Sequence, residues 1–450
     1  MNEMLKSLGW PRDDVNAAIR SRWRLHALAL LLLALCLPVY LTFANTLDRL
    51  EVTEQYNLLF DADANRGAKC FANGWASGRT IVHPNLCNLT NPLVRVTAGA
   101  LAVLGLAEGG AELRHRVALA LVPIVSSLTV LLVFATFLTL RCGAPGAFLL
   151  ALLYGVSFSQ LIFGSMPEHF ALSGFALVLT LWLLSQAVEH RRYSLPLWAV
   201  AGVLSLSITI TNFLLFGLAL LAALGLRQPW RQACRWGLSV VALAFALTLL
   251  IKLPLDALYG GADNTVGRLV RFTTDYMRDG GPLQALAGYP MQLVASIVGP
   301  ETLVVPDRLV QEGARYDFQF SLEGARFVGG LSQAAALSVA ALLVAGCAHG
   351  LRSLVARNRG ELALFVTAIG TLLFNGLLHA FWGNGYFLYS QHWQFASWIL
   401  LAWPLRTRLR HPALAVCAIA LVLVAVNNFQ EVARMLDILE QAQAMKAGGD

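Results

Sequence analysis

The sequence predicts an all-α polytopic membrane protein that crosses the bilayer about eleven times. Three observations predict this class: a mean hydropathy of +0.62, a charged fraction of only 13%, and recurring apolar runs of about 20 residues, the length of a membrane-spanning helix. A soluble domain carries about a quarter charged residues, which argues against a water-soluble protein. The alternating pattern of a transmembrane barrel is absent.

Each apolar run is expected to form one span. The eleven expected spans are 25–44, 117–140, 145–163, 169–187, 196–210, 212–226, 236–253, 331–350, 361–381, 393–405 and 412–429. Residues 196–226 are divided near TITN, because a single crossing would place Arg227, Arg231 and Arg235 on the outer side. The first run is longer than a signal-peptide core and has no small-residue cleavage site, so we expect it to be retained.

The spans divide the chain into four parts. These are a cytoplasmic segment over 1–24, a first membrane module over 25–226, a second membrane module over 227–429, and a tail over 430–450 that is a short amphipathic helix at most. The modules include two large outer loops, loop one over 45–116 and loop four over 254–330. Both loops are expected to bear short surface helices, one of them in the weakly apolar stretch LVRVTAGALAVLGLA.

Basic residues orient this map, because short loops rich in Lys and Arg stay in the cytoplasm. Every segment expected to lie inside contains at least one: Lys6, Arg12, Arg20, Arg22 and Arg24; Arg141; Arg191 and Arg192; Arg227, Arg231 and Arg235; Arg352, Arg357 and Arg359; Arg406, Arg408 and Arg410. The short outer loops contain none. We therefore expect an inner-membrane protein with its N-terminus inside. The pI of 9.2 reflects this placement and does not indicate nucleic-acid binding.

Two of the seven cysteines, Cys70 and Cys87, are expected outside the membrane, in loop one. An oxidising compartment permits a disulfide between them. No C-x-x-C motif is present, so zinc binding is not indicated.

Unusual polar residues gather on the outer side of the map. They are Asp61, Asp63 and His83 in loop one, Glu168 and His169 in the turn GSMPEHF, Lys252, Arg268 and Arg271 near the start of loop four, and Gln391 and His392 at a span start. Each has an alternative role: a loop aspartate is usually solvated, Glu168 can stabilise a helix start, Lys252 can reach the membrane surface along its aliphatic stem, and His392 can be an interfacial residue. Their shared side favours a site.

Three segments resemble a known family. They are FDADANRG (60–67), HPNLCNLTNPL (83–93) and SMPEHFALSGFALVLTLWLL (165–184). In order and spacing, over about residues 25–225, the chain is similar to the GT-C superfamily of integral-membrane glycosyltransferases, and within it to the protein-mannosyltransferase and aminoarabinose-transferase branch. The C-terminal half resembles that family only in its hydropathy pattern.

The resemblance implies a polyprenyl-phosphate-sugar donor, whose head faces the periplasm, and a glycan, lipid or protein acceptor of the cell envelope. A first-loop aspartate would be the catalytic base of an inverting transfer, and this role falls on Asp61 or Asp63, with Asp61 favoured because it directly follows the apolar NLLF. The second acidic residue of the family corresponds to Glu168. A carboxylate within hydrogen-bond reach can take the proton of an acceptor hydroxyl.

Cations are needed for the lipid phosphate that leaves. The expected donor-phosphate and substrate-binding residues are His83, His169, Lys252, Arg268, Arg271, Gln391 and His392. Asp61, Asp63, Glu168 and His169 are also candidates for holding a divalent cation, Mg or Mn, through hard oxygen ligands, although the branch resembled here generally uses no metal.

Two other functions remain open. A lipid-linked glycan polymerase or ligase also places a large basic outer loop above many spans, but relies more on outer arginines and histidines than on first-loop aspartates. A transporter or flippase places ionisable residues at mid-membrane and often shows inverted repeats. Spans 2–6 carry almost no charge at mid-span, and the two halves are not alike.

Overall fold

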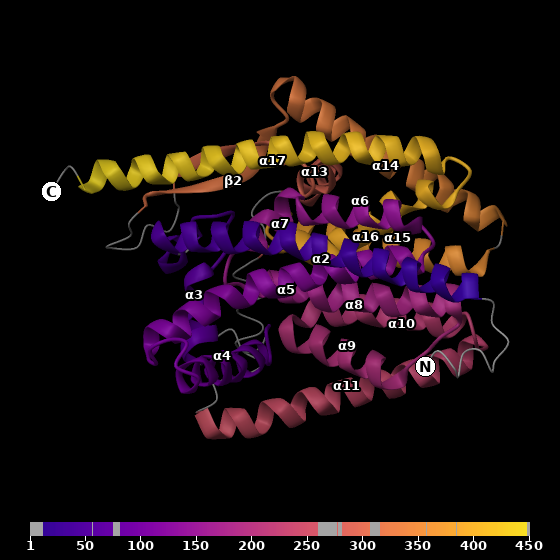
Figure 1. The fold of residues 1–450 in the computed structure, drawn as a ribbon, viewed down its shortest axis with the longest axis horizontal. Coiled ribbons are helices and arrows are strands. Elements are labelled where there is room, and N and C mark those ends of the chain that lie inside the picture. Colours follow the sequence, from indigo (N-terminus) through magenta and orange to yellow (C-terminus); the bar gives the residue numbers. More distant parts are fainter. Residues whose placement is uncertain are drawn as a thin grey trace.

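The structure, a computed structural model, describes residues 12–55, 57–74, 82–259, 277, 281–306, 316–356, 358–383 and 385–447. It is a bundle of long helices whose axes run side by side (Figure 1). The bundle helices are α2 (Arg12–Arg49), α5 (Ala111–Thr139), α6 (Gly143–Gly155), α7 (Phe158–Phe163), α8 (His169–His190), α9 (Leu195–Ile208), α10 (Ile210–Gly225), α11 (Trp230–Tyr259), α14 (Gly329–Ala356), α15 (Arg359–Phe381), α16 (Ser390–Ala402) and α17 (Arg410–Ala447).

Seven helices in the described part of the chain are long and apolar enough to cross a membrane. These are α2, α5, α8, α11, α14, α15 and α17, and three shorter apolar helices, α6, α9 and α10, accompany them. Each expected span falls on a helix, so the multi-pass helical class is confirmed. The number of eleven crossings and their orientation stay predictions, because the shorter helices do not meet the length of a full span.

Three of the expected spans are interrupted or change helix type in the structure. The span expected over 145–163 is divided into α6 and α7, and the one over 393–405 ends in a 3-10 helix, η2 (Trp403–Arg406). The expected division near TITN falls at Thr209, whose backbone is extended (φ −152°, ψ 121°) between α9 and α10. These two helices then pack against each other.

One end of the bundle gathers the arginine-bearing turns. Glu189, at the end of α8, accepts from Arg141 Nε at 3.0 Å and also pairs with Arg406. Arg191 donates to the carbonyl of Leu226, at the end of α10, at 3.3 Å. Turns that the sequence places on one membrane side therefore meet one another, as that side assignment requires.

Loop one lies at the other end of the bundle, on the left in Figure 1. It contains a short 3-10 helix, η1 (Val52–Glu54), and two helices, α3 (Ala64–Asn73) and α4 (Leu86–Val103). Cys70 and Cys87 form a disulfide that joins α3 to α4. The expected surface helix is α4, which leaves Leu93, Val96 and Val103 exposed.

The described part of loop four includes the helix α13 (Pro282–Ala295) and a β-hairpin, which was not predicted from the sequence. Strand β1 (Glu301–Pro306) pairs antiparallel with β2 (Phe318–Arg326), with Val304 opposite Phe320. The burial of Phe320 and Leu322 follows the alternation of a strand with one covered face.

The last helix, α17, continues without a break through the boundary predicted at residue 430, as far as Ala447. A helix of 38 residues is about 57 Å long, well beyond a hydrocarbon core of about 30 Å. In Figure 1 its C-terminal half extends past the bundle alongside β2.

Candidate active site

The aspartate loop, residues 57–63, has an unusual backbone conformation. Asn57, Phe60 and Asp61 have φ angles of 60°, 57° and 62°. Asn and Asp tolerate this left-handed region, whereas a bulky residue such as Phe rarely adopts it. Strand β2 stabilises it, because Phe60 N–H donates to the Phe320 carbonyl at 3.1 Å, and Phe320 N–H donates to the Leu58 carbonyl at 2.8 Å. Loop four therefore fixes the backbone that carries Asp61, whose own side chain is partly exposed.

Aromatic rings extend from this loop to the start of α8. The ring centroid of Phe60 lies 4.8 Å from that of Phe387 and 6.0 Å from that of Phe158. Phe387 contacts Phe163 at 5.4 Å, and Phe163 contacts Phe170 at 4.9 Å. Edge and tilted contacts of this kind are favourable arrangements for aromatic rings. They connect the aspartate loop to the first turn of α8.

Asp63 immediately precedes α3, and the residue is 7% exposed. Its Oδ2 lies 3.5 Å from Nη1 of Arg66, one turn into the helix. The following residue is Gly67, where a Cβ atom would lie 1.7 Å from the carbonyl oxygen of Pro167. Only glycine permits this approach. The helix that Asp63 begins therefore rests directly on the turn that bears Glu168.

Glu168 caps the start of α8 and is 2% exposed. Its Oε2 accepts from the backbone N–H of His169 at 2.5 Å and lies 2.5 Å from Nδ1 of the same residue. A carboxylate at a helix N-terminus interacts favourably with the helix dipole. Glu168 thus has the stabilising role named as its alternative, and it also orients an imidazole.

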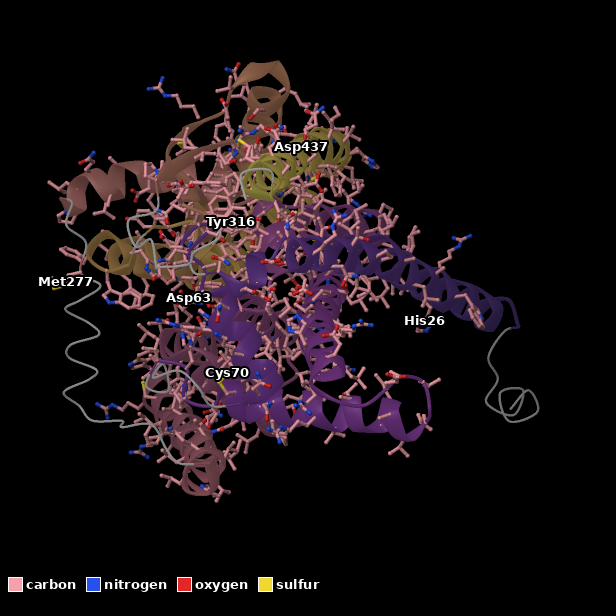
Figure 2. All side chains as sticks on the ribbon, turned by 90° about the vertical axis from the view of Figure 1, so that its left-hand side faces the viewer. His26, Asp63, Cys70, Met277, Tyr316 and Asp437 are labelled. Atoms are coloured by element: carbon pink, nitrogen blue, oxygen red, sulfur yellow. A yellow bond between two sulfur atoms is a disulfide. The ribbon has the colours of Figure 1, made fainter. Side chains whose placement is uncertain are left out.

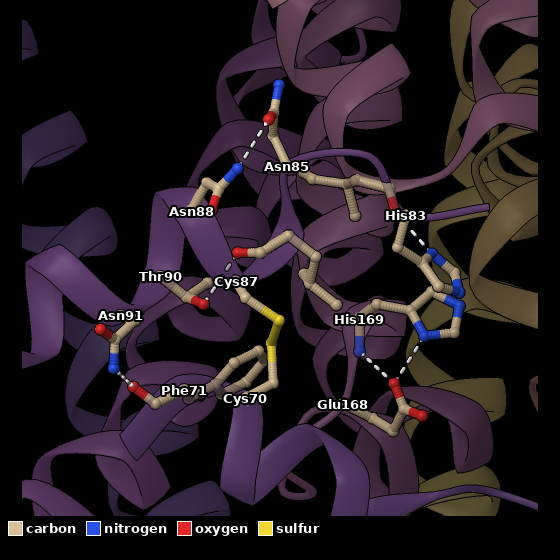
Figure 3. Close-up of a disulfide and its surroundings, with 12 residues drawn as sticks. Cys70, Phe71, His83, Asn85, Cys87, Asn88, Thr90, Asn91, Glu168 and His169 are labelled. Carbon is tan, nitrogen blue, oxygen red and sulfur yellow. Dashed lines mark hydrogen bonds and ion pairs between the residues drawn. A yellow bond between two sulfur atoms is a disulfide. The ribbon is translucent and has the colours of Figure 1, made fainter. Parts of the chain in front are cut away.

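Three buried imidazoles lie beside this carboxylate. The rings of His83 and His169 are 4.0 Å apart, and His392 is 5.8 Å from His169. Nδ1 of His83 lies 2.6 Å from the Ile208 carbonyl and 3.3 Å from Oγ1 of Thr209, at the break between α9 and α10. Nε2 of His392 has no hydrogen-bond partner among the described residues. Figure 3 shows His83, His169 and Glu168 next to the disulfide.

The site lies at the end of the bundle opposite the arginine-bearing turns. Figure 2 looks onto this end and labels Asp63 between Tyr316 and Cys70. The Tyr316 hydroxyl donates to the carbonyl of Leu50, at the end of α2, at 2.8 Å. Loops one and four therefore contact each other and cover the same end of the bundle.

Other predicted residues lie in different surroundings. Gln391 donates through Nε2 to Ser159 Oγ and to Gln394 Oε1, each at 3.3 Å, within a buried polar cluster under α7. Lys252 is on α11, along the lower edge of the molecule in Figure 1. Arg268 and Arg271 lie outside the described residues.

The predicted metal ligands are not grouped around one point. Within the described ranges, no cluster of three or more His, Cys, Asp or Glu side chains is arranged to hold a metal ion. Of the four named residues, Glu168 and His169 contact each other directly.

Some residues near the site are not among the site residues expected from the sequence. His379 stacks on Tyr389 at 3.9 Å with the two ring planes 8° apart, next to His392. Thr209 links His83 to Ser173 Oγ, 3.1 Å away on α8. A period-two pattern, FQFSL, signals the β2 strand, and the glycine one turn after Asp63 signals a close backbone approach.

The chain is only distantly similar to known proteins. No family model matches the sequence, and no curated protein matches it. Two crystal structures of the Archaeoglobus fulgidus oligosaccharyltransferase align with 89% of the chain, one in the apo form and one tethered to an acceptor peptide containing the NVT sequon through a disulfide bond. The TM-scores are 0.44 and 0.42, at 16% and 14% identity, and the alignments cover 56% and 55% of that protein. The chain thus spans about half of its length, and likeness at this level does not establish a shared activity.

Proposed function

We propose that the protein is a membrane glycosyltransferase of the GT-C type. It transfers a sugar from a polyprenyl-phosphate donor to a cell-envelope glycan, lipid or protein on the periplasmic face of the inner membrane. One observation carries the proposal: the contact of Gly67 with Pro167 joins the aspartate segment of loop one to the Glu168 turn. These are two of the three segments on which the family resemblance rests.

The acidic residues suit the reaction. Asp61 is partly exposed, and it is the proposed general base that takes the proton of an acceptor hydroxyl. Asp63 and Glu168 are buried and are proposed to stabilise positive charge as the sugar acquires oxocarbenium character.

The imidazoles suit the leaving group. A lipid phosphate needs hydrogen-bond donors or cations as its bond to the sugar breaks. His392 has a buried Nε2 with no hydrogen-bond partner among the described residues, and its ring centroid lies 5.8 Å from that of His169. Protonated or as the appropriate tautomer, these imidazoles donate to phosphate oxygens. The apolar helices keep the lipid tail of the donor in the bilayer.

Carboxylate-to-amide variants in proteoliposomes test the proposal. We expect Asp61→Asn, Asp63→Asn and Glu168→Gln to accumulate normally, and at least one aspartate variant to lose about 100-fold or more of sugar transfer. The measurement is the release of polyprenyl phosphate from a panel of polyprenyl-phosphate hexoses and pentoses. Glu112→Gln, an exposed carboxylate paired with Arg116 at 2.8 Å, is the matched control and retains transfer.

The same assay separates the alternatives. Full activity in both aspartate variants would refute the site assignment. Release of polyprenyl pyrophosphate from a pyrophosphate-linked glycan, with the aspartates dispensable and the histidines required, would favour a polymerase or ligase. Movement of labelled lipid across the bilayer without any glycosidic product would favour a transporter.

A further inference from the structure

The middle of α17, just after its apolar run, carries polar side chains that are buried. Asn428 is fully buried, and Asn427 and Glu431 are less than 10% exposed. A buried amide or carboxylate is costly unless its hydrogen bonds are satisfied. Their partners are in other parts of the chain, so these residues join α17 to segments far away in the sequence.

Asn428 connects two such segments through one amide group. Its Oδ1 accepts from the backbone N–H of Gly299 at 2.7 Å. Its Nδ2 donates to the carbonyl of Val156 and to the carbonyl of Ile297, each at 2.8 Å. Both donor hydrogens of the amide are used, and Oδ1 also accepts from Nδ2 of Asn427 at 3.2 Å, so its acceptor sites are used too. One side chain therefore holds the break between α6 and α7 against the start of the loop-four hairpin.

The first segment leads to Glu168. Val156 is followed by α7, a helix of six residues, and then by the turn that bears the glutamate. The backbone N–H groups of Phe158 and Ser159 donate to the carbonyls of Ile297 and Ser296, at 3.0 and 2.9 Å. Because α7 is this short, its anchorage at Val156 governs the position of the turn that follows.

The second segment leads to Asp61. Glu431 accepts from the backbone N–H and the hydroxyl of Thr302, at 2.7 and 2.5 Å, and Arg434 donates to the Thr302 carbonyl at 2.6 Å. Thr302 is in β1, β1 pairs with β2, and β2 holds the backbone of Phe60. Asp61 is the next residue.

We propose that α17 sets the relative position of the two acidic segments, and that Asn428 is the positioning residue common to both. Glu431 and Arg434 act on the hairpin segment alone. The consequence for catalysis rests on the proposed function, but the mechanical link does not. None of these three side chains is proposed to contact a substrate.

Hydrogen exchange of the full chain in nanodiscs tests the link without any substrate. Asn428→Ala is expected to accelerate exchange of the Phe60 N–H and of the amides in 164–168 by about tenfold, because the Gly299 N–H and the carbonyls of Val156 and Ile297 each lose a hydrogen bond to this side chain. Glu431→Gln places an amide beside the Arg434 guanidinium and is expected to accelerate exchange at Phe60 only. Asn375→Ala is the matched control: among the described residues this buried amide donates to the Thr371 carbonyl, within its own helix, at 3.0 Å, so neither region is expected to respond.

Several results would overturn the inference. They are a response to Asn428→Ala confined to 296–299, an equal response to Asn375→Ala, or an unchanged Phe60 amide in Glu431→Gln. If Asn428→Ala does not accumulate, the exchange rate of the Phe60 amide in Glu431→Gln still tests the link, because this variant preserves the shape of the side chain.

Kinetics then connect the link to catalysis. A misplacement of about 1 Å at a reacting group costs about 100-fold in rate, so Asn428→Ala is expected to lower kcat with little change in KM, whereas Asn375→Ala leaves both unchanged. If no donor supports transfer by the wild-type protein, the proposed function fails while the exchange experiment still decides the link. If transfer occurs and Asn428→Ala alters exchange without altering kcat, positioning for catalysis is refuted.

Discussion

Replacing Gly67 by alanine is the sharpest perturbation that the structure offers at the candidate site. The added Cβ would lie 1.7 Å from the Pro167 carbonyl oxygen, 2.8 Å from its carbon and 3.2 Å from Cα of Glu168. All three are backbone atoms, so no side-chain rotation relieves the overlap. Ordinary contact begins at 3.4 Å, so α3 and the Glu168 turn must separate by about 1.7 Å.

Two opposing contributions determine how Gly67→Ala changes the free energy of unfolding. Alanine in a helix interior is favoured over glycine by about 1 kcal/mol, whereas overpacking a close-packed contact costs about 1–3 kcal/mol and sometimes more. We therefore expect a net loss of up to about 2 kcal/mol in the free energy of unfolding. Transfer should suffer more, by about 100-fold, because the displacement exceeds 1 Å between Asp63 and Glu168.

The assay measures sugar transfer in proteoliposomes and thermal unfolding in detergent for Gly67→Ala and for Gly99→Ala. Gly99 is in α4 of the same loop, and a Cβ there meets no atom within 4 Å. The control is expected to retain transfer and to gain up to about 1 kcal/mol. Wild-type transfer and stability in Gly67→Ala would show that the two segments do not depend on this contact.

Two further predictions concern parts of the fold around the site. Replacing both Cys70 and Cys87 by serine opens a loop with a sequence separation of 17. The free energy of unfolding should fall by about 3 kcal/mol, which is measured as a lower Tm. Mass spectrometry that found two free thiols in wild-type protein prepared without reductant would contradict the bridge. Glu189→Gln leaves Arg141 and Arg406 without their shared carboxylate and should destabilise the protein by about 1–3 kcal/mol. The kcat should be unchanged, because Glu189 lies at the end of the bundle far from the candidate site. A large loss of kcat at unchanged Tm would contradict that placement.

The sequence predicted the helices because their signals are local. An apolar run of the required length is enough to indicate a membrane helix, and arginines in the turns indicate which turns share a side of the membrane. For that reason the positions of Arg141 and Arg406 agreed with the expected arrangement, and Thr209 fell at the expected break. The tail over 430–450 carried no such signal of continuity, although α17 runs through it.

Contacts between distant segments could not be predicted in the same way. The pairing of Leu58 and Phe60 with Phe320 depends on two loops whose sequences do not specify each other. The alternation of Phe318, Phe320 and Leu322 with polar residues indicates a strand, but the abundance of Gly, Pro and charge in loop four obscured it. Asn428 is one of two adjacent asparagines at the end of an apolar run, and the local sequence does not indicate which distant segments they contact.

The pairing of Phe60 with Phe320 also has a consequence for biogenesis. Chains are synthesised from the N-terminus, so loop one is complete before β2 and α17 exist. During that interval the aspartate segment lacks the strand that holds it, even after the Cys70–Cys87 bridge has formed. A chain interrupted before β2 is therefore expected to insert most of its helices and yet remain without an assembled reaction centre.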